Sequence, residues 1–232
     1  MSFSQEIERA RGVSGELVLR RGPAGLEVIA NGVFLVSAAN AASSRALVQA
    51  AWEYVRGDSL DVLIGGLGIG DALDEALGSR LVAAVTVAEL EPVIVRWFRE
   101  HGGETARRVA EAERAGRARI IAGDVADQLT RTGRWDVVAL DTDNGPEWLV
   151  REENAGLYAP AGLRRVYDAL RPGGVAVFWS PERYPLFEGD LIDAFDRLER
   201  VAAVDVIDGR SHTFTMYVAL RHGVGLTASG VD

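Results

Sequence analysis

Hydrophobic and polar positions follow two different patterns along the chain. Between residues 16 and 37, three short β-prone runs (ELVLRR, LEVIAN and GVFLVS) are separated by Gly-Pro-Ala-Gly at 22–25 and by Asn31-Gly32. An Asn-Gly pair between apolar runs is a strong hairpin signal. The pattern therefore predicts a small antiparallel β-hairpin unit. An Ala- and Leu-rich first helix is expected to follow it over residues 41–55.

From residue 61 onward, short apolar runs alternate with segments of helical character. The runs are continuously apolar, as is typical of strands buried on both faces of a parallel sheet. They cover residues 61–65, 84–90, 118–123, 135–141 and 174–180. Helices are predicted at 71–77, 92–101, 125–130, 161–170 and 185–198, with 171–174 (Arg-Pro-Gly-Gly) ending the fourth of them. Residues 201–208 and 212–220 are predicted to form a closing β-hairpin.

This alternation predicts an α/β protein with a Rossmann-like, doubly wound, mostly parallel sheet. We expect residues 1–56 to form the N-terminal β-hairpin unit and the first helix, and residues 57–222 to form the Rossmann-like domain. Residues 223–232 contain mostly small and turn residues, so we expect a flexible tail.

Composition narrows the class of protein. The 232 residues are enough for one domain plus a small appendage, and 48% hydrophobic with 25% charged residues is typical of a soluble globular chain. No apolar run is long enough for a membrane span, and the polar N-terminus lacks a signal peptide's apolar region, so we expect a cytoplasmic protein. The absence of cysteine excludes disulfides and thiol nucleophiles, and because the three histidines are far apart in the sequence, we expect no metal site.

The net charge of −9 bears on possible partners. A surface that follows nucleic-acid phosphates needs a basic face, so nucleic acid is disfavoured as partner or substrate. An acidic protein tolerates cationic ligands such as amines and sulfonium compounds. Acidity also aids solubility, which is a sufficient explanation for most of the charge.

A glycine-rich segment carries the first candidate chemistry. The run DVLI leads into a loop with Gly65, Gly66, Gly68 and Gly70, and the next strand ends in Glu89. Glycines allow the backbone to approach a ligand, and an acid about 20 residues beyond such a loop can accept both ribose hydroxyls. The segment therefore predicts a nucleoside site. The alternative is a tight β–α turn followed by a solvated Glu.

Further polar residues follow the other predicted strands. In doubly wound sheets, ligands bind beyond the carboxyl ends of the strands, and this rule selects Asp124, Asp141 and Ser180 in addition to the loop and Glu89. Asp124 can accept a hydrogen bond from an exocyclic amine such as that of adenine. It can equally cap the helix predicted at 125–130, and both roles can hold at once.

The loop after the strand at 135–141 is the second candidate site. Asp141, Asp143 and Asn144 stand directly at the strand end, and such a cluster is suited to binding an amine and taking its proton. The alternative is an ordinary Asx-rich turn. Trp148, Tyr158 and Trp179 are candidates for lining a pocket near a sulfonium, because aromatic faces attract cations, although aromatics are more often core residues.

Together these motifs resemble the spermidine synthase branch (polyamine aminopropyltransferase-like) of the class I S-adenosylmethionine-dependent methyltransferase superfamily. The resemblance covers about residues 16–220 and rests on VLIGGLGIGDAL, VAELEP, AGDVADQL, WDVVALDTDNGP and YAPAGLRRVYDALRPGGVAVFWS. It implies a methyltransferase-type sheet, with S-adenosylmethionine or its decarboxylated form as co-substrate and no metal. It also implies that Glu89 binds ribose, that Asp124 binds adenine and that Asp141 deprotonates an attacking amine.

The chain also departs from that family. Spermidine synthases carry an Asp inside the glycine loop, which suits the decarboxylated co-substrate, whereas Leu67 and Gly68 stand there in this chain. The second acid of the family's Asp-x-x-Asp loop is either shifted to Asp143 or replaced by Asn144. Ser44-Arg45 replaces a Tyr-His or Tyr-Gln pair, and Arg45 suits a substrate carboxylate better than a polyamine cation.

The leading hypothesis is a spermidine synthase-like transferase that moves an aminopropyl or aminocarboxypropyl arm to an amine, or cyclises that arm internally. The acceptor would be a small amine or an amino-acid-like molecule, with Arg45, Trp148, Tyr158, Trp179 and Ser180 as candidate binding residues. Methyl transfer from S-adenosylmethionine is the enzyme alternative, and a non-catalytic nucleoside-binding module is the other. A nicotinamide-dependent dehydrogenase is a weaker fit. The resemblance also implies a homodimer formed through the N-terminal β unit.

Overall fold

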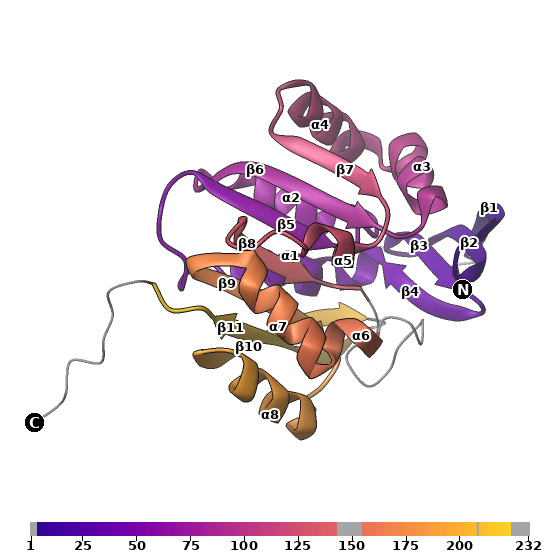
Figure 1. Cartoon of the computed structure of the whole chain (residues 1–232). Helices are drawn as coiled ribbons and strands as arrows, with labels where there is room; N and C mark the ends of the chain where they lie inside the picture. Colours follow the sequence, from indigo (N-terminus) through magenta and orange to yellow (C-terminus); the bar gives the residue numbers. More distant parts are fainter. Residues whose placement is uncertain (1–3, 143–154, 208, 224–232) are drawn as a thin grey trace, which may run out of the picture.

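A computed structural model describes residues 4–142, 155–207 and 209–223. Figure 1 shows two sheets of unequal size, a small one built from the N-terminal residues and a larger one with helices on both faces. The parallel strands of the larger sheet point their carboxyl ends toward the small sheet (Figure 1). This arrangement decides where a ligand can bind.

The small sheet has four antiparallel strands in chain order. They are β1 (Gln5–Gly12), β2 (Gly15–Gly22), β3 (Gly25–Ala30) and β4 (Val33–Ser37). The turn between β3 and β4 is the predicted Asn31-Gly32 pair, with φ angles of 50° and 83°. Two consecutive left-handed residues are what a two-residue hairpin turn requires, which confirms that prediction.

The larger sheet has seven strands in the order β10-β11-β9-β8-β5-β6-β7. Their bounds are β5 (Leu60–Gly65), β6 (Val82–Glu89), β7 (Ala118–Ala122), β8 (Trp135–Leu140), β9 (Leu170–Ser180), β10 (Arg197–Ile207) and β11 (Arg210–Leu220). Strands β5 to β9 run parallel, and β11 pairs antiparallel with both β9 and β10. The predicted fold class, a mostly parallel doubly wound sheet with a closing antiparallel hairpin, is confirmed.

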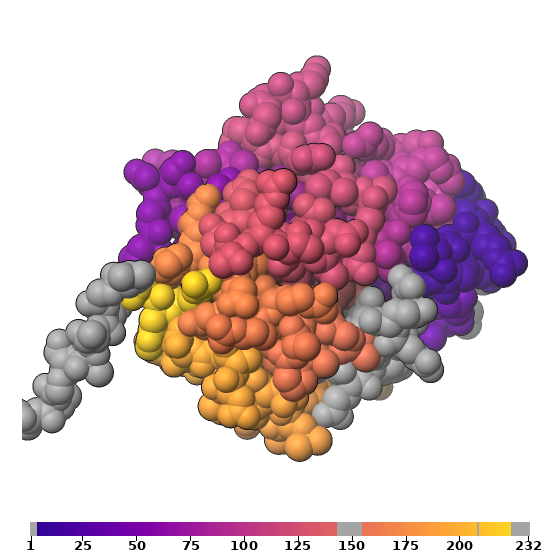
Figure 2. All heavy atoms as spheres, viewed as in Figure 1, coloured from indigo at the N-terminus to yellow at the C-terminus, as the bar shows by residue number. Residues whose placement is uncertain are grey.

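The described helices cover both faces of this sheet. They are α1 (Ala41–Gln49), preceded by a 3-10 turn η1 (Ala38–Asn40), α2 (Asp71–Gly78), α3 (Pro92–His101), α4 (Gly103–Arg114), α5 (Val125–Gln128), α6 (Ala155–Tyr158), α7 (Pro160–Ala169) and α8 (Pro185–Ala194). Figure 2 shows one face of the molecule, on which residues of α5, α6 and α7 lie at the surface. Within the described ranges, no helix combines the length and apolar character needed to cross a membrane.

Side chains of the central strands alternate between two cores, as a sheet covered on both faces requires. On β5, Val62 and Ile64 pack into the cluster that contains α1 and α2 residues, whereas Leu63 packs into the cluster that contains α7 and α8 residues. All three side chains are at most 1% exposed. The continuous apolar runs in the sequence are therefore explained by burial on both faces.

Glu91, two residues beyond β6, joins the small sheet to the larger one. Its carboxylate is buried and accepts hydrogen bonds from the backbone amides of Val13 (2.7 Å) and Ser14 (2.6 Å) in the β1–β2 turn. Apolar residues of both parts pack beside it, namely Leu17, Leu19 and Val28 with Ile94 and Trp97 of α3. This docking brings β4 against the glycine loop.

Asp205 of β10 fixes the start of α1. The carboxylate is 3% exposed and accepts hydrogen bonds from the backbone amides of Ala42 (2.9 Å) and Ser43 (3.1 Å). These amides belong to the first turn of the helix, where no carbonyl partner exists. A strand of the larger sheet thus positions the helix that carries Ser44 and Arg45.

The structure differs from the sequence prediction in several places. Helix α1 ends at Gln49 rather than at residue 55, and α8 ends at Ala194 rather than at residue 198. Strand β1 was not predicted, because its residues are largely polar and exposed on an edge of the small sheet. Helix α4 was not predicted either, since Val109 is its one buried residue and its apolar stripe is weak. The fourth predicted helix ends at Ala169, just before residues 171–174, as expected. The strand that follows it begins earlier than predicted, because Leu170 already pairs with Trp135 of β8.

Candidate functional site

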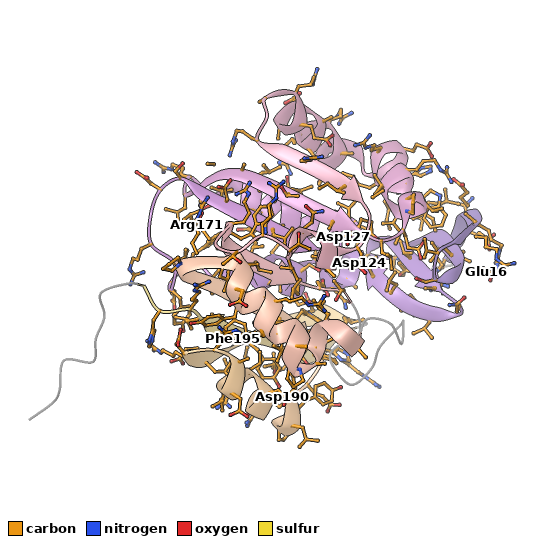
Figure 3. All side chains as sticks on the ribbon, in the orientation of Figure 1. Glu16, Asp124, Asp127, Arg171, Asp190 and Phe195 are labelled. Atoms are coloured by element: carbon orange, nitrogen blue, oxygen red, sulfur yellow. The ribbon has the colours of Figure 1, made fainter. Side chains whose placement is uncertain are left out.

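The two ends of the parallel strands carry different sets of charged residues. At the amino ends, Arg171 forms an ion pair with Asp61 (2.8 Å) and a second with Asp136, so these charges neutralise one another. Figure 3 shows Arg171 at this end and Asp124 at the other. The carboxyl ends carry the glycine loop, Glu89, Asp124 and Asp141, so this edge is the candidate site.

The glycine loop connects β5 to α2 with backbone angles that other residues rarely adopt. The φ angles are +94° at Gly66, +54° at Gly68 and +94° at Gly70. A Cβ at Gly66 would lie 2.3 Å from the carbonyl oxygen of Asp141, which is backbone and cannot rotate away. The loop is therefore close to the β8 end and leaves space where side chains would otherwise stand.

Glu89 ends β6 with its side chain under the glycine loop. One carboxylate oxygen accepts from the Leu67 amide and the other from the Glu91 amide, both at 2.8 Å. The side chain is buried, and this burial raises the pKa of Glu89 although backbone hydrogen bonds act in the opposite direction. A carboxylate offers about four acceptor positions, so Glu89 can still accept a hydrogen bond from a ligand.

Asp124 follows β7 and caps the short helix α5. Its Oδ1 accepts a hydrogen bond from the Ala126 amide at 2.8 Å, which is the capping geometry considered for this residue from sequence. The residue is exposed and also lines the pocket described below. A cap occupies one of its oxygens and leaves the other available to a ligand.

Asp141 follows β8 directly. Its amide donates to the Gly65 carbonyl at 2.9 Å, which holds the ends of β8 and β5 together. The next residue, Thr142, shares a 2.9 Å hydrogen bond between its hydroxyl and that of Tyr158 in α6. Asp141 and Thr142 are both half-buried and accessible from the pocket.

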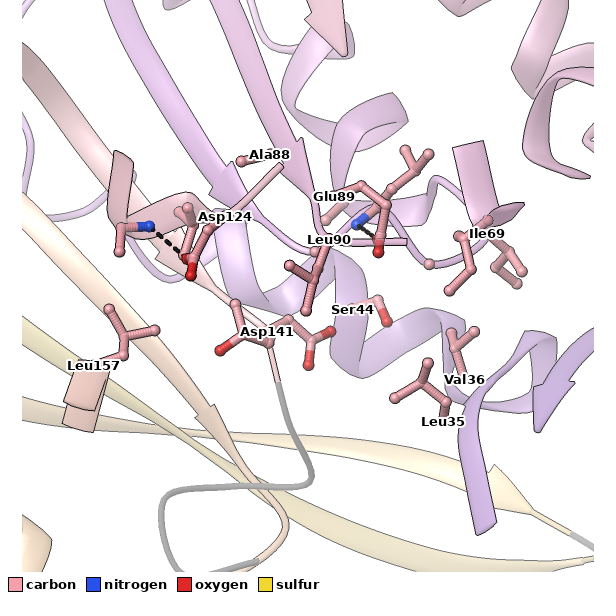
Figure 4. Close-up of a pocket in the computed structure, with 18 of the residues that line it drawn as sticks. Leu35, Val36, Ser44, Ile69, Ala88, Glu89, Leu90, Asp124, Asp141 and Leu157 are labelled. Atoms are coloured by element: carbon pink, nitrogen blue, oxygen red, sulfur yellow. Dashed lines mark hydrogen bonds between the residues drawn. The ribbon is translucent and has the colours of Figure 1, made fainter. Parts of the chain in front are cut away.

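These residues surround a pocket of about 330 Å³, which we call the first chamber. Figure 4 shows Asp124 and Leu157 at one end and Val36 and Ile69 at the other, with Glu89 and Asp141 between them. Its described lining also includes Leu35, Ser44, Gly66, Leu67, Gly68, Asp71, Ala72, Ala88, Leu90, Ile94, Val125, Ala126, Thr142, Gly156 and Arg165. The described lining therefore extends from Asp124 and Leu157 past Glu89 and Asp141 to Val36 and Ile69.

A second chamber of about 590 Å³ adjoins the first between the small sheet and the larger one. Leu35, Val36, Ser44 and Asp141 line both chambers. Its other described lining residues include Glu27, Phe34, Ser37, Asn40, Trp179 and Ile207. The first and second chambers therefore meet at the Asp141 carboxylate.

Several candidates from the sequence lie elsewhere. Arg45 is not among the described lining residues of either chamber, because it extends along α1 toward α2 and forms an ion pair with Asp71 at 3.0 Å. Ser180 is fully buried, and its hydroxyl donates to the Glu182 carbonyl at 2.7 Å. Tyr158 is buried beneath Thr142 as a supporting residue.

The remaining candidates divide into two groups. Trp179 lies in the second chamber, stacked on Phe214 with ring centroids 5.2 Å apart. Asp143, Asn144 and Trp148 lie outside the described residues.

Sequence reasoning missed two charged residues of the first chamber. Asp71 is the first residue of α2, and its place directly after the glycine loop was the available signal. Arg165 of α7 also lines the first chamber, and its neighbours in the sequence carry no pattern that distinguishes it from an ordinary exposed arginine. The positions of Asp71 and Arg165 in the chamber depend on how α2 and α7 pack around the edge of the sheet.

A cluster of Glu8, Glu100 and His101 has the ligand spacing of a possible metal site. Arg96 forms ion pairs with both carboxylates, at 3.0 Å to Glu100 and through a close contact to Glu8. Arg96 therefore already compensates the negative charge of the Glu8 and Glu100 carboxylates. These residues are not among the described lining of either chamber.

Comparison with known proteins gave matches to structures only. No protein-family model and no curated protein matches the chain. A spermidine synthase in complex with the transition-state analogue AdoDATO superposes with a TM-score of 0.77 at 16% identity, covering 98% of this chain and 75% of that one. The spermidine synthase from Thermotoga maritima gives a TM-score of 0.75 at 17% identity, covering 98% of this chain and 74% of that one.

The matches extend over nearly the whole chain, so they include both the small sheet and the larger one. At such low identity they establish the arrangement of the elements and leave the chemistry to be argued from the site. The chain therefore has the methyltransferase-like α/β fold of the spermidine synthases, with a mostly parallel seven-stranded sheet and a separate antiparallel N-terminal sheet.

Proposed function

We propose that the chain is a spermidine synthase-like transferase that moves an alkyl arm from a sulfonium nucleoside to a small amine. The single observation that carries this proposal is that two chambers meet at Asp141. A transfer reaction needs two substrates side by side with a base at their junction. The first chamber would hold the donor, either S-adenosylmethionine or its decarboxylated form, and the second would hold the acceptor.

The first chamber has the features that a nucleoside requires. The Gly66–Gly70 backbone leaves open space beside Glu89, whose oxygens retain lone pairs for ribose hydroxyls. Asp124 and Leu157 at one end would contact the adenine, through its exocyclic amine and its face respectively. One of the structural relatives, a spermidine synthase, is in complex with the transition-state analogue AdoDATO, which supports a spermidine synthase-like assignment.

The second chamber suits an amine with an apolar body. Phe34, Trp179 and Ile207 offer apolar surface, and Ser37 and Asn40 offer hydrogen-bonding groups. Glu27 is buried, and it is held in an ion pair with Arg20 at 2.7 Å. The amine end would therefore point toward Asp141 at the junction.

The proposed step forms one bond and breaks another. The lone pair of the amine nitrogen attacks a carbon attached to the sulfonium sulfur, and the carbon–sulfur bond breaks with its electron pair going to sulfur. The donor leaves as a neutral thioether nucleoside. The Asp141 carboxylate takes the proton that the amine nitrogen loses and passes it to solvent.

Identification of the nucleoside product tests this function. We expect methylthioadenosine when the protein is incubated with either donor and a set of small amines. Methyl transfer is the second candidate, because Leu67 and Gly68 leave the loop without an acid and so admit the carboxylate of intact S-adenosylmethionine. S-adenosylhomocysteine as the product would establish that candidate, and binding without any product would indicate a nucleoside-binding module.

The pH dependence of nucleoside binding tests the role of Glu89. Burial raises the pKa of Glu89, so on acidification its carboxylate takes up a proton at a higher pH than an ordinary glutamate does. Protonation removes an acceptor for ribose. We therefore expect the affinity for methylthioadenosine, measured by calorimetry, to decline during acidification before ordinary carboxylates titrate.

Glu89→Gln provides the matched control for that titration. The amide has similar shape but does not titrate, so its affinity should be lower and should lack this part of the pH dependence. An unchanged pH profile in Glu89→Gln would show that another group is responsible.

The division into units at residues 56 and 57, the homodimer and the cytoplasmic location stay predictions from sequence. The proposed chemistry depends on none of them.

A further inference from the structure

Asp71 is a carboxylate in the first chamber that the proposed step does not use. It begins α2 directly after the glycine loop, and its side chain is 16% exposed. Arg45 of α1 donates from Nη2 to its Oδ1 at 3.0 Å. Arg45 itself lines a separate groove between α1, α2 and α4, together with Trp52 and Arg108. The ion pair thus separates the two cavities, with its carboxylate on the first chamber's side.

The place of Asp71 within the first chamber can be defined from its neighbours. It follows Ile69 by two residues, and its partner Arg45 directly follows Ser44. Figure 4 shows Ile69 on the far side of Glu89 from Asp124, and Ser44 between Asp141 and Val36. If adenine binds at Asp124 and ribose at Glu89, the donor's arm extends toward Asp71.

The groups around Asp71 make the ionisation of its carboxyl group depend on Arg45. Burial raises the pKa of Asp71, and Asp74 and Asp205 add to this effect, whereas the Arg45 guanidinium favours the ionised form. Asp74 has its own cation in Arg108, and Asp205 accepts from the first amides of α1. Arg45 is therefore the cation that balances Asp71.

We propose that the Asp71–Arg45 pair selects the donor by the charge of its arm, and that it favours the zwitterionic amino-acid arm of intact S-adenosylmethionine. Asp71 would accept a hydrogen bond from the arm's ammonium group. Arg45 would cancel the remaining negative charge, so that the arm's carboxylate is not repelled. This inference rests on the proposed function, because it assumes that the first chamber holds a sulfonium nucleoside.

The test compares the affinities of S-adenosylmethionine and its decarboxylated form by calorimetry in two variants. Arg45→Gln leaves Asp71 without its cation, so the affinity ratio should shift about tenfold toward the decarboxylated donor. Asp71→Asn removes the ammonium partner and the source of repulsion, so the ratio should shift about tenfold toward S-adenosylmethionine. Arg45→Lys keeps the charge and should keep the wild-type ratio.

The neighbouring pair supplies a matched control. Arg108 of α4 pairs with Asp74 one turn further along α2 and lines the same groove as Arg45, but neither residue is among the described lining of the first chamber. Arg108→Gln should therefore leave the ratio unchanged. A shift equal to that of Arg45→Gln would show a general charge effect and overturn the proposal.

Methylthioadenosine, which lacks the charged arm, separates the possible failures. It should bind all variants with wild-type affinity, which also shows that they are folded. If it binds and the donor ratio stays constant in both variants, or shifts in the same direction, the pair only joins α1 to α2 and the inference is wrong. If it does not bind the wild-type protein, the proposed function itself fails.

Discussion

Asp141→Asn is expected to abolish turnover while nucleoside binding is retained. A positioned general base typically contributes roughly 10²–10⁴-fold to a rate, and asparagine has the same shape but cannot take the amine's proton. The hydrogen bond that joins Asp141 to Gly65 uses the backbone amide, so the substitution does not remove it. Formation of methylthioadenosine measures turnover, and calorimetry with that nucleoside measures binding.

Asp193→Asn is the control for this charge change. Asp193 is an exposed residue of α8 and is not among the described lining of either chamber. Its variant should match the wild-type protein in both measurements. Wild-type turnover by Asp141→Asn would contradict the assignment of the base, and loss of binding as well as turnover would indicate a structural role.

Gly66→Ala should destabilise the protein and prevent nucleoside binding. The added Cβ would lie 2.3 Å from the Asp141 carbonyl oxygen, and the φ of +94° is unfavourable for any residue with a side chain. Because the contact is with backbone, the loop or the end of β8 has to move. We expect a loss in the free energy of unfolding on the order of 2–4 kcal/mol, measured by urea denaturation.

Gly78→Ala is the matched control, since the same methyl group is added at the last residue of α2. Gly78 is exposed, and no atom lies within 4 Å of the position its Cβ would take. This variant should be unchanged or up to about 1 kcal/mol more stable. Equal unfolding midpoints for the two variants would show that the glycine loop does not approach β8 closely.

Both predictions concern the point where β5 and β8 separate in the sheet. Gly66 follows β5 and Asp141 follows β8, and the two strands are neighbours although Gly66 and Asp141 are 75 positions apart in the sequence. The loop that would hold the donor and the residue proposed as base are therefore fixed to each other by one sheet. A displacement of either would change the distance on which the proposed transfer depends.

The site carboxylates could be predicted from their places at the ends of predicted strands. The sequence places Glu89, Asp124 and Asp141 after three apolar runs, and the structure brings all three to one chamber. Their adjacency follows from parallel strand order alone, because carboxyl ends of parallel strands lie at one edge. The cap of α5 by Asp124 was one of the two roles predicted for that residue. The Leu67 and Glu91 amides that donate to Glu89 were not predictable, since they are set by local loop geometry.

Arg45 shows where the same reasoning stops. Its position in the aligned sequence favoured a contact with a substrate carboxylate, but the structure pairs it with Asp71, 26 positions away in the chain. The pairing depends on how α1 packs on α2. No periodicity within either helix contains this information, because a helix pattern defines a face but not the neighbour that the face meets.

Local sequence patterns are sufficient to predict the parallel sheet with its closing hairpin, the β-hairpin turn at Asn31-Gly32 and the acids at the strand ends. These features depend on the alternation of neighbouring residues and on turn chemistry, which act over a few positions. The second chamber and the Asp71–Arg45 pair could not be predicted in this way, because they depend on tertiary contacts. Both arise where the small sheet and α1 dock on the larger sheet through Glu91 and Asp205, and such contacts join residues distant in the chain.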